Sequence, residues 1–256
     1  MTQSICIIPA RMASSRFPGK PMKHLLGMPL IQHVWERCQL AKEIDHVIVA
    51  TCDQEIYDCI VNVGGSAIMT SNKHERCTDR VAEAIENGNF NLKEDDLVLM
   101  VQGDEVMVNP ELLDDMIRLY KKTKAPAINL VSRLYNIKEH DDPNVVKIVT
   151  DLENRIIFLS RSPIPSRSRS STVEMYQQTG IIAYSSSFLT KYAGIPQTPL
   201  EIAESIDMLR LIENGIPLFS IKSEVETIGV DTENDRKRAE VFLEKDDITS
   251  RYLNIK

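Results

Sequence analysis

The residues best suited to chemistry stand in a short loop near the start of the chain. Arg11, Arg16 and Lys20 follow the apolar run Ser4–Ala10, and the first 24 residues contain no Asp or Glu, although the whole chain has a formal net charge of −7. A Lys ammonium suits a polyphosphate, and Arg can clamp phosphate or carboxylate with two hydrogen bonds. The loop is therefore predicted to bind phosphates, with a merely solvated loop as the alternative. It is not a Walker loop, because neither GxxxxGKS nor GxxxxGKT occurs.

Two carboxylates also stand where apolar runs stop. Asp104 follows the run LVLMVQ at 97–102, and Asp231 ends the segment ETIGVD. A carboxylate beside a phosphate is repulsive unless a cation lies between them, so Asp104 is predicted to hold Mg²⁺ against phosphate oxygens. For Asp231 the residues alone leave two roles open: a second metal ligand, and the N-cap of a helix that begins near Thr232.

A parallel sheet is needed to bring these positions together. Strand-like runs at 4–10, 46–51, 66–70 and 97–102 alternate with helical patterns at about 30–41, 53–63, 78–86 and 110–124. This alternation predicts an α/β fold whose mostly parallel sheet is covered on both faces. Asp53 is expected to cap the second helix, and Cys77 or Thr78 the third. Ligands of such sheets lie outside the carboxyl ends of the strands, which here are the segments 11–20, 70–78, 102–105 and 231–232.

The pattern changes after residue 125. The runs 127–134, 145–150 and 155–160 are closely spaced, which predicts antiparallel pairing and an extension or small second lobe. The Ser- and Arg-rich segment 161–172 contains two prolines and is predicted to be a loop, with a lid and a plain surface loop both open. Further strands are expected at 180–184, 218–221 and 226–230, and helices at 200–214 and 231–244.

Composition limits the class of protein. Hydrophobic residues make up 43% of the 256 and charged residues 26%, as in an ordinary soluble globular protein. No apolar run reaches the roughly eighteen residues of a membrane span, and no secretory signal is recognised. Five cysteines without a CxxC pair indicate reduced thiols in the cytoplasm rather than a zinc knuckle or a disulfide framework. The acidic net charge argues against general nucleic-acid binding.

The opening IIPARMASSRFPGKPM resembles that of the CMP-Kdo synthetases, the 3-deoxy-manno-octulosonate cytidylyltransferases. Further matching stretches follow over nearly the whole chain: GMPLIQHVWERC, VIVATCD, TDR, VQGDE, DPNVVKIV, FLSRSPIP, PLE, LR and GVDT. The resemblance implies a Rossmann-like nucleotidyltransferase domain over 1–256, with a smaller inserted antiparallel dimerisation lobe at about 130–200. It also implies a cytoplasmic homodimer that transfers CMP from CTP to Kdo or a Kdo-like 3-deoxy-2-ulosonic acid. The reaction would need Mg²⁺, release pyrophosphate and serve lipopolysaccharide or capsule biosynthesis.

The resemblance carries roles over to particular residues. Arg11, Lys20 and Asp104 are expected to be catalytic, with Asp104 and Asp231 as the metal ligands. The expected nucleotide-binding residues are Ala10, Arg11, Ser15, Lys20, Thr70, Ser71, Thr78, Arg80, Gln102 and Gly103. The expected acceptor-binding residues are Arg76, Gln102, Arg161, Gln178, Tyr184 and Asp207.

Three departures from the family pattern lie on the acceptor side. The family's His-x-Gly-Ile-Tyr-x-Tyr reads Gln178-Thr179-Gly180-Ile181-Ile182-Ala183-Tyr184, its Glu-Gln before Leu-Arg reads Asp207-Met208, and its Ser-Gly-Thr reads Arg76-Cys77-Thr78. Ile and Met cannot bind sugar hydroxyls as an imidazole or a phenol does. Two hypotheses stay open: Kdo is retained, or CTP chemistry serves another sugar acid, a phosphonate or a phosphorylated compound. In the second case, extra negative charge would meet Arg76, Arg161, Arg167 and Arg169.

Two other classes of protein are disfavoured. Sugar-1-phosphate nucleotidyltransferases typically open with a GGxGTRL-type loop, which this chain lacks. A non-enzymatic binding module would be expected to have lost Lys20, Asp104 or Asp231, and all three are present.

Overall fold

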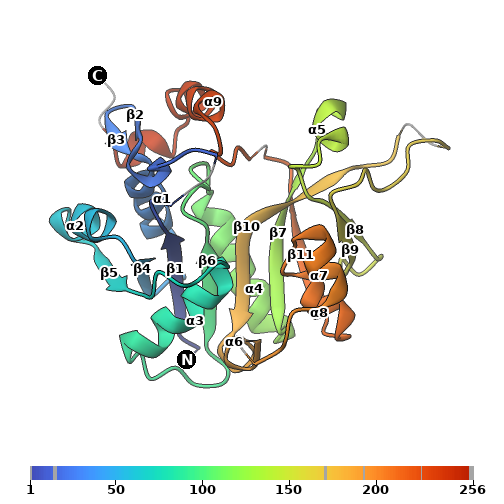
Figure 1. Cartoon of the computed structure of the whole chain (residues 1–256), viewed down its shortest axis with the longest axis horizontal. Helices are drawn as coiled ribbons and strands as arrows, with labels where there is room; N and C mark the ends of the chain where they lie inside the picture. The colour runs from blue at the N-terminus through green and yellow to red at the C-terminus, as the bar shows by residue number, and fades with distance from the viewer. Residues whose placement is uncertain (1, 14–15, 170–171, 193, 226, 254–256) are drawn as a thin grey trace.

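The fold is organised around one large sheet. A computed structural model describes residues 2–13, 16–169, 172–192, 194–225 and 227–253. Within this part of the chain the sheet has nine strands, seven of them in the order β11-β7-β10-β6-β1-β4-β5, while β8 and β9 continue from β10 (Figure 1). This is the mixed α/β architecture, with a mostly parallel half, that the sequence predicts.

The parallel half is built from four strands and the helices that connect them. Strands β1 (Ser4–Ala10), β4 (His46–Thr51), β5 (Ser66–Met69) and β6 (Leu97–Val101) pair in parallel. The connecting helices are α1 (Leu30–Gln39), α2 (Gln54–Asn62), α3 (Cys77–Gly88) and α4 (Pro110–Thr123). Every residue of β1 and β6 is buried, which explains why both runs are almost wholly apolar.

Helices cover both faces of the sheet, so there are two hydrophobic clusters. One cluster packs Leu30 of α1 and Leu113 of α4 against one face of the sheet, and Ala239 of α9 (Glu233–Leu243) joins it. The other packs Val81 of α3 against the opposite face, with Leu189 of α6 (Ser186–Tyr192). This two-sided cover leaves the carboxyl edge of the strands as the place where polar loops gather.

The second half of the sheet is mixed. Strand β10 (Tyr176–Ser185) runs antiparallel to β6 and to β7 (Ala127–Arg133), while β11 (Leu218–Ser223) runs parallel to β7. Strands β8 (Lys147–Thr150) and β9 (Ile156–Ser160) form an antiparallel hairpin, and β8 pairs with the start of β10. The predicted antiparallel pairing is thus confirmed for this hairpin. A separate dimerisation lobe at about 130–200 stays a prediction.

Short elements complete the chain. Near the first loop lie the 3-10 turn η1 (Lys20–Met22) and the strand pair β2 (His24–Leu25) and β3 (Met28–Pro29). The remaining elements are α5 (Ile137–Asp141), α7 (Pro199–Glu204), α8 (Leu209–Glu213) and η2 (Thr249–Arg251). Among the described helices, none has the length and apolar character needed to cross a membrane.

Two predicted elements were wrong. The expected helix over 200–214 is broken into α7 and α8, because Ser205 ends α7 with a left-handed φ of 54°. The expected strand over 226–230 is absent from 227–230, and residue 226 lies outside the described residues.

Two predicted caps also need correction. Asp53 holds the N-cap position of α2 but makes no side-chain capping bond there, and its Oδ2 instead accepts a hydrogen bond from the backbone N–H of Met12 at 2.8 Å. Helix α3 begins at Cys77, so Arg76 takes the N-cap position rather than Cys77 or Thr78.

Candidate active site

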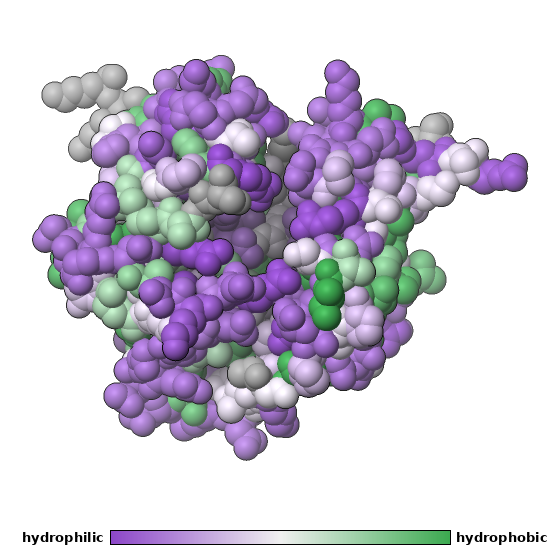
Figure 2. Space-filling view, viewed as in Figure 1, coloured by the Kyte–Doolittle hydropathy of each residue, from purple (hydrophilic) through white to green (hydrophobic). Residues whose placement is uncertain are grey.

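A cavity of about 620 Å³ lies outside the carboxyl ends of the strands. The hollow is visible between the two halves of the upper surface in Figure 2. This volume falls in the usual range of small-molecule sites. The predicted residues that line the cavity are Arg76, Gln102, Asp104, Arg161, Gln178, Asp207 and Asp231.

The cationic loop meets both predicted metal-binding carboxylates. The Nζ of Lys20 lies 2.7 Å from Asp104 Oδ2 and 2.9 Å from Asp231 Oδ1, and the guanidinium of Arg16 lies 2.8 Å from Asp231 Oδ2. Burial by itself would lower the pKa of Lys20, but the two carboxylates outweigh it and raise that pKa above its ordinary value. Because one ammonium contacts both carboxylates, Asp104 and Asp231 lie close together, although 127 positions separate them in the sequence.

The structure excludes one of the two roles left open for Asp231, that of the helix N-cap. Thr232 is the N-cap of α9, and its side chain accepts a hydrogen bond from the N–H of Asp235 at 3.2 Å. The carboxylate of Asp231 is not the cap and faces Lys20 and Arg16 instead. Its position therefore keeps the metal-ligand role available.

Hard carboxylate oxygens of this kind suit Mg²⁺, which proteins usually hold with one or two carboxylates while substrate phosphates and water supply the other ligands. In the described part of the chain, no group of three or more His, Cys, Asp or Glu side chains could hold a metal. The pair Asp104 and Asp231 thus fits a magnesium ion that arrives with a nucleotide, and does not form a complete protein cage.

The segment after β5 is held beside the first loop by arginines. Arg80 donates to Thr70 Oγ1 at 2.5 Å and to the carbonyl of Ser71 at 3.1 Å. Arg11 donates to the carbonyl of His74 at 3.2 Å. These contacts bring Arg80, Thr70 and Ser71 together, and tie Arg11 to the same segment through His74.

Gly103, Ala10 and Ser15 are also predicted to bind the nucleotide. Gly103 lies against β1, where its N–H donates to the carbonyl of Pro9 at 3.2 Å and an added Cβ would meet that oxygen at 3.1 Å. Ala10 is buried at the end of β1. Ser15 lies outside the described residues.

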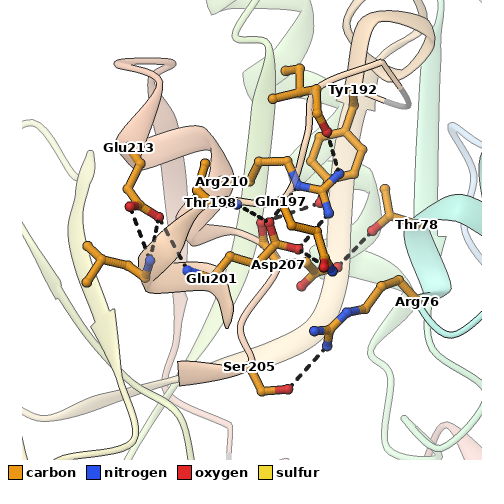
Figure 3. A network of polar contacts seen from close by, with 12 residues as sticks. Arg76, Thr78, Tyr192, Gln197, Thr198, Glu201, Ser205, Asp207, Arg210 and Glu213 are labelled. Atoms are coloured by element: carbon orange, nitrogen blue, oxygen red, sulfur yellow. Dashed lines mark hydrogen bonds and ion pairs between the residues drawn. The ribbon is translucent and has the colours of Figure 1, made fainter. Parts of the chain in front are cut away.

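The acceptor side is shaped by the break between α7 and α8 (Figure 3). Asp207 Oδ2 accepts a hydrogen bond from Thr78 Oγ1 at 3.0 Å, and Arg76 donates to Ser205 Oγ at 3.3 Å. Withdrawal from solvent raises the pKa of Asp207, although the Thr78 hydrogen bond and the charge of Arg76 oppose the shift. The break therefore turns a serine and a carboxylate toward the cavity.

A buried ion pair holds α7 and α8 in place. Arg210 donates to both carboxylate oxygens of Glu201, at 2.7 and 2.5 Å, and its guanidinium lies over the ring of Tyr192 (Figure 3). These are the Arg of LR and the Glu of PLE, and neither lines the cavity. Both motif residues are therefore part of the supporting structure in this chain.

The structure separates the other acceptor-side residues into two groups. Gln178 and Ile182 of β10 line the cavity, as does Arg161, whose guanidinium donates to the carbonyls of Glu204 at 2.6 Å and Pro143 at 2.9 Å. Tyr184 is fully buried behind the wall, with its hydroxyl 3.4 Å from Thr78 Oγ1. The structure thus does not bring Tyr184 to the cavity.

Three residues of the cavity wall were missed as site residues. Arg16 belongs to the predicted phosphate-binding loop but is not among the residues to which the resemblance gives a role, and Glu105 follows Asp104 in VQGDE without any further sequence signal. Ser205 had no signal, because its place depends on the break after α7. Glu105 is 6% exposed, and burial together with the charge of Asp104 raises its pKa to about 7.

A cation loop facing two carboxylates, at the carboxyl edge of a mostly parallel sheet, defines a nucleotidyltransferase site. A family model described as "Cytidylyltransferase" matches residues 5–228, and the chain therefore belongs to the cytidylyltransferase family.

Named relatives and a solved structure agree with this family. A 3-deoxy-manno-octulosonate cytidylyltransferase of Thermodesulfovibrio yellowstonii is 40% identical over 94% of this chain and 98% of its own length. One of Geobacter sulfurreducens is 37% identical over 91% of this chain and 96% of its own length. The structure of a CMP:2-keto-3-deoxy-manno-octonic acid synthetase complexed with CTP has a TM-score of 0.88 and 32% identity, covering 95% of this chain and 99% of that one.

Proposed function

We propose that this enzyme joins CMP from CTP to Kdo or a Kdo-like 3-deoxy-2-ulosonic acid and releases pyrophosphate. The observation that carries the proposal is the contact of Lys20 with both Asp104 and Asp231, two carboxylates that line the same cavity as Gln178 and Asp207. Relatives named for this activity that align over more than nine-tenths of this chain support it.

The reaction makes one bond and breaks one. The acceptor hydroxyl oxygen bonds to the α-phosphorus of CTP while the bond from that phosphorus to the bridging oxygen breaks. The bridging oxygen leaves with the pyrophosphate, and the hydroxyl proton is released to water. Phosphoryl-type transfer depends mainly on positioning and charge neutralisation, so no nucleophilic side chain is needed. In this proposal Arg11, Arg16 and Lys20 bind and orient the triphosphate.

Asp104 and Asp231 would hold Mg²⁺ in this proposal. When bound, the ion neutralises phosphate charge on the reacting nucleotide. The close approach of the two carboxylates to one ammonium supports this assignment, because it places hard oxygen ligands at a common point beside the phosphate-binding loop.

The first experiment measures pyrophosphate release from CTP with Kdo and a panel of other sugar acids, phosphonates and phosphorylated acids. Robust turnover with Kdo is the expected result. Exclusive turnover of another acid would favour the second candidate, the same CTP chemistry on a different anionic acceptor. One observation favours that candidate: Arg76 stands on the cavity wall, where Ile182 contributes no polar group. Arg167 gives it no support, because it pairs with Asp141 away from the wall.

The metal assignment has its own test. Asp104→Ala should leave a folded protein whose pyrophosphate release falls by about 10²–10⁴-fold, the scale lost when a group that stabilises transition-state charge is removed. Asp115→Ala, on the exposed side of α4, is the matched control and should keep full activity. Unchanged turnover in Asp104→Ala would remove Asp104 from the site.

We also propose that the enzyme is a cytoplasmic homodimer whose product enters lipopolysaccharide or capsule synthesis. The cytoplasm is supported by the five cysteines, which are all free thiols. The homodimer is supported by apolar side chains on the β8–β9 hairpin, where Leu152 is fully exposed and Ile157 is 55% exposed. The pathway follows from the proposed acceptor, because a CMP-activated sugar acid is consumed by transfer to a glycan.

A further inference from the structure

The segment 102–105 is tied to three parts of the fold at once. Toward β1, the N–H of Gly103 donates to the carbonyl of Pro9 at 3.2 Å. Toward the second carboxylate, the N–H of Val230 donates to the carbonyl of Asp104 at 3.2 Å, one residue before Asp231. Because these two bonds join loops that come from distant parts of the sequence, they fix the nucleotide side of the site.

The third tie runs to β10 and the acceptor wall. The N–H of Gln102 donates to the carbonyl of Gly180 at 2.9 Å, and the N–H of Gly180 donates to Glu105 Oε1 at 2.5 Å. An added Cβ on Gly180 would lie 2.8 Å from the Gln102 side chain, so only glycine permits this approach. Gly180 is therefore held through both of its backbone polar groups.

Gly180 stands at an irregularity in β10. The pairing of β10 with β7 shifts register between Gln178 and Ile182, two residues that line the cavity. On the β7 side, the amide of Asn129 donates to the carbonyls of Thr179 and Ile181 at 3.2 and 2.9 Å. A bulge leaves backbone groups without ladder partners. Here Asn129 of β7 and Glu105, in the segment that follows β6, supply those partners.

The carboxylate of Glu105 has no second role among the described contacts. Its Oε2 is buried and has no hydrogen-bond partner in the described part of the chain. A buried carboxylate with one oxygen unsatisfied is costly to a fold. Such a group is expected to persist where it serves a site.

We propose that Glu105 is a positioning residue that sets the acceptor wall against the nucleotide. Through Gly180 it fixes Gln178 and Ile182 relative to Asp104, and so fixes where the acceptor hydroxyl meets the α-phosphate. This inference rests on the proposed function for its kinetic readout. A wall that is held in place before the acceptor binds need not be ordered on binding, which strengthens acceptor binding and gives such a tether its value.

The experiment compares Glu105→Ala and Glu105→Gln in the full chain, using steady-state kinetics with CTP and whichever acid the wild type turns over. Glu105→Ala should raise the KM for the acceptor about 10- to 100-fold, the equivalent of one hydrogen bond to a charged group. The KM for CTP should stay within about twofold, because the ties to Pro9 and Val230 are kept. Glu105→Gln retains an oxygen acceptor and should restore the acceptor KM to within a few-fold of the wild type.

Asp96→Ala is the matched control, since Asp96 is also buried and accepts backbone N–H bonds, from Gln3 and Lys93, at the opposite end of β6. It should lose stability with both KM values unchanged in the folded enzyme. A parallel rise of both KM values in Glu105→Ala, or no change in either, would overturn the proposal. Gly180→Ala keeps Glu105 and should raise the acceptor KM as well.

A measurement without turnover separates this inference from the proposed function. The amide proton resonance of Gly180, hydrogen-bonded to a carboxylate, should move in Glu105→Ala together with those of Gln178 and Ile182. If no acid supports turnover while these resonances move, the proposed function fails and the tether stands. If these resonances do not move, the positioning role proposed for Glu105 is wrong, whichever acid is the substrate.

Discussion

The buried carboxylate of Asp207 lowers the stability of the fold at neutral pH. Asp207 is drawn out of solvent to line the cavity, and the hydrogen bond from Thr78 does not fully compensate, because the pKa of Asp207 stays raised. A raised carboxyl pKa means that the folded state binds the proton more tightly than the unfolded chain, in which Asp titrates near about 4. The resulting stability is present below about pH 4 and is lost as the pH rises through the folded pKa.

Replacement of Asp207 by Asn should therefore stabilise the protein at neutral pH while weakening acceptor binding. Asn keeps an oxygen for Thr78 but carries no charge to desolvate. In thermal unfolding followed from pH 4 to pH 8, the unfolding temperature of Asp207→Asn should exceed that of the wild type at pH 7–8, with the difference shrinking toward pH 4. A variant that unfolds at a lower temperature than the wild type at pH 8 would contradict this prediction.

At the scale of elements, the break between α7 and α8 is what forms the acceptor wall. Ser205 takes a left-handed conformation that a non-glycine residue adopts only with outside support. The support comes from the buried pair of Arg210 and Glu201, which joins the two helices across the break. Arg210 also donates to the carbonyl of Ile195 at 3.1 Å, which extends the same support to the segment before α7.

Replacing one member of the Arg210–Glu201 pair should lower the free energy of unfolding, whereas replacing both should lower it much less. Arg210→Met leaves Glu201 buried and uncompensated, for an expected loss of about 3–5 kcal/mol in the free energy of unfolding by urea. Adding Glu201→Met should recover most of that loss, because apolar side chains of similar size can replace a buried pair. Arg155→Met, in the exposed pair with Asp151, is the control and should have a far smaller effect. Equal losses in the single and double variants would contradict the role given to the pair.

At the scale of the whole molecule, one sheet carries two different surfaces. Its parallel half presents the cationic loop and the two carboxylates. The β8–β9 hairpin lies on the other side of the molecule (Figure 1), and its apolar side chains Leu152 and Ile157 are exposed. Exposed apolar groups that gather on one element are typical of an interface between subunits. The proposed dimer uses this surface.

Ile157→Lys, on the outer side of β9, should convert the proposed dimer to a monomer. Its charge would have to be buried at the interface without a partner. Size-exclusion chromatography with light scattering measures the mass directly, against 29.0 kDa for one chain. Phe242→Lys, at a 44%-exposed position on α9, is the control and should leave the mass unchanged. A wild-type protein that runs as a monomer would remove the dimer proposal.

The sequence by itself determined the framework of the nucleotide half. Apolar strands alternating with amphipathic helices are a local pattern, and they predict the parallel sheet, its buried centre and the edge where polar loops meet. Lys20 and Asp104 could be predicted as site residues because the segments that carry them follow apolar strands, so the rule that ligands bind beyond the strand ends applies to them.

Tertiary structure alone decided the rest of the site. The role proposed for Asp231 depends on its contact with Lys20 across 211 positions, and the role proposed for Glu105 on its hydrogen bond to Gly180 across 75. The break at Ser205 and the withdrawal of Tyr184 behind the wall likewise come from packing, since local propensity favours an unbroken helix and shows no difference between a buried and an exposed tyrosine. Hydrophobic periodicity depends only on residues that are close in the sequence. The proposed acceptor wall is formed by contacts between distant segments, and these contacts exist only in the folded chain.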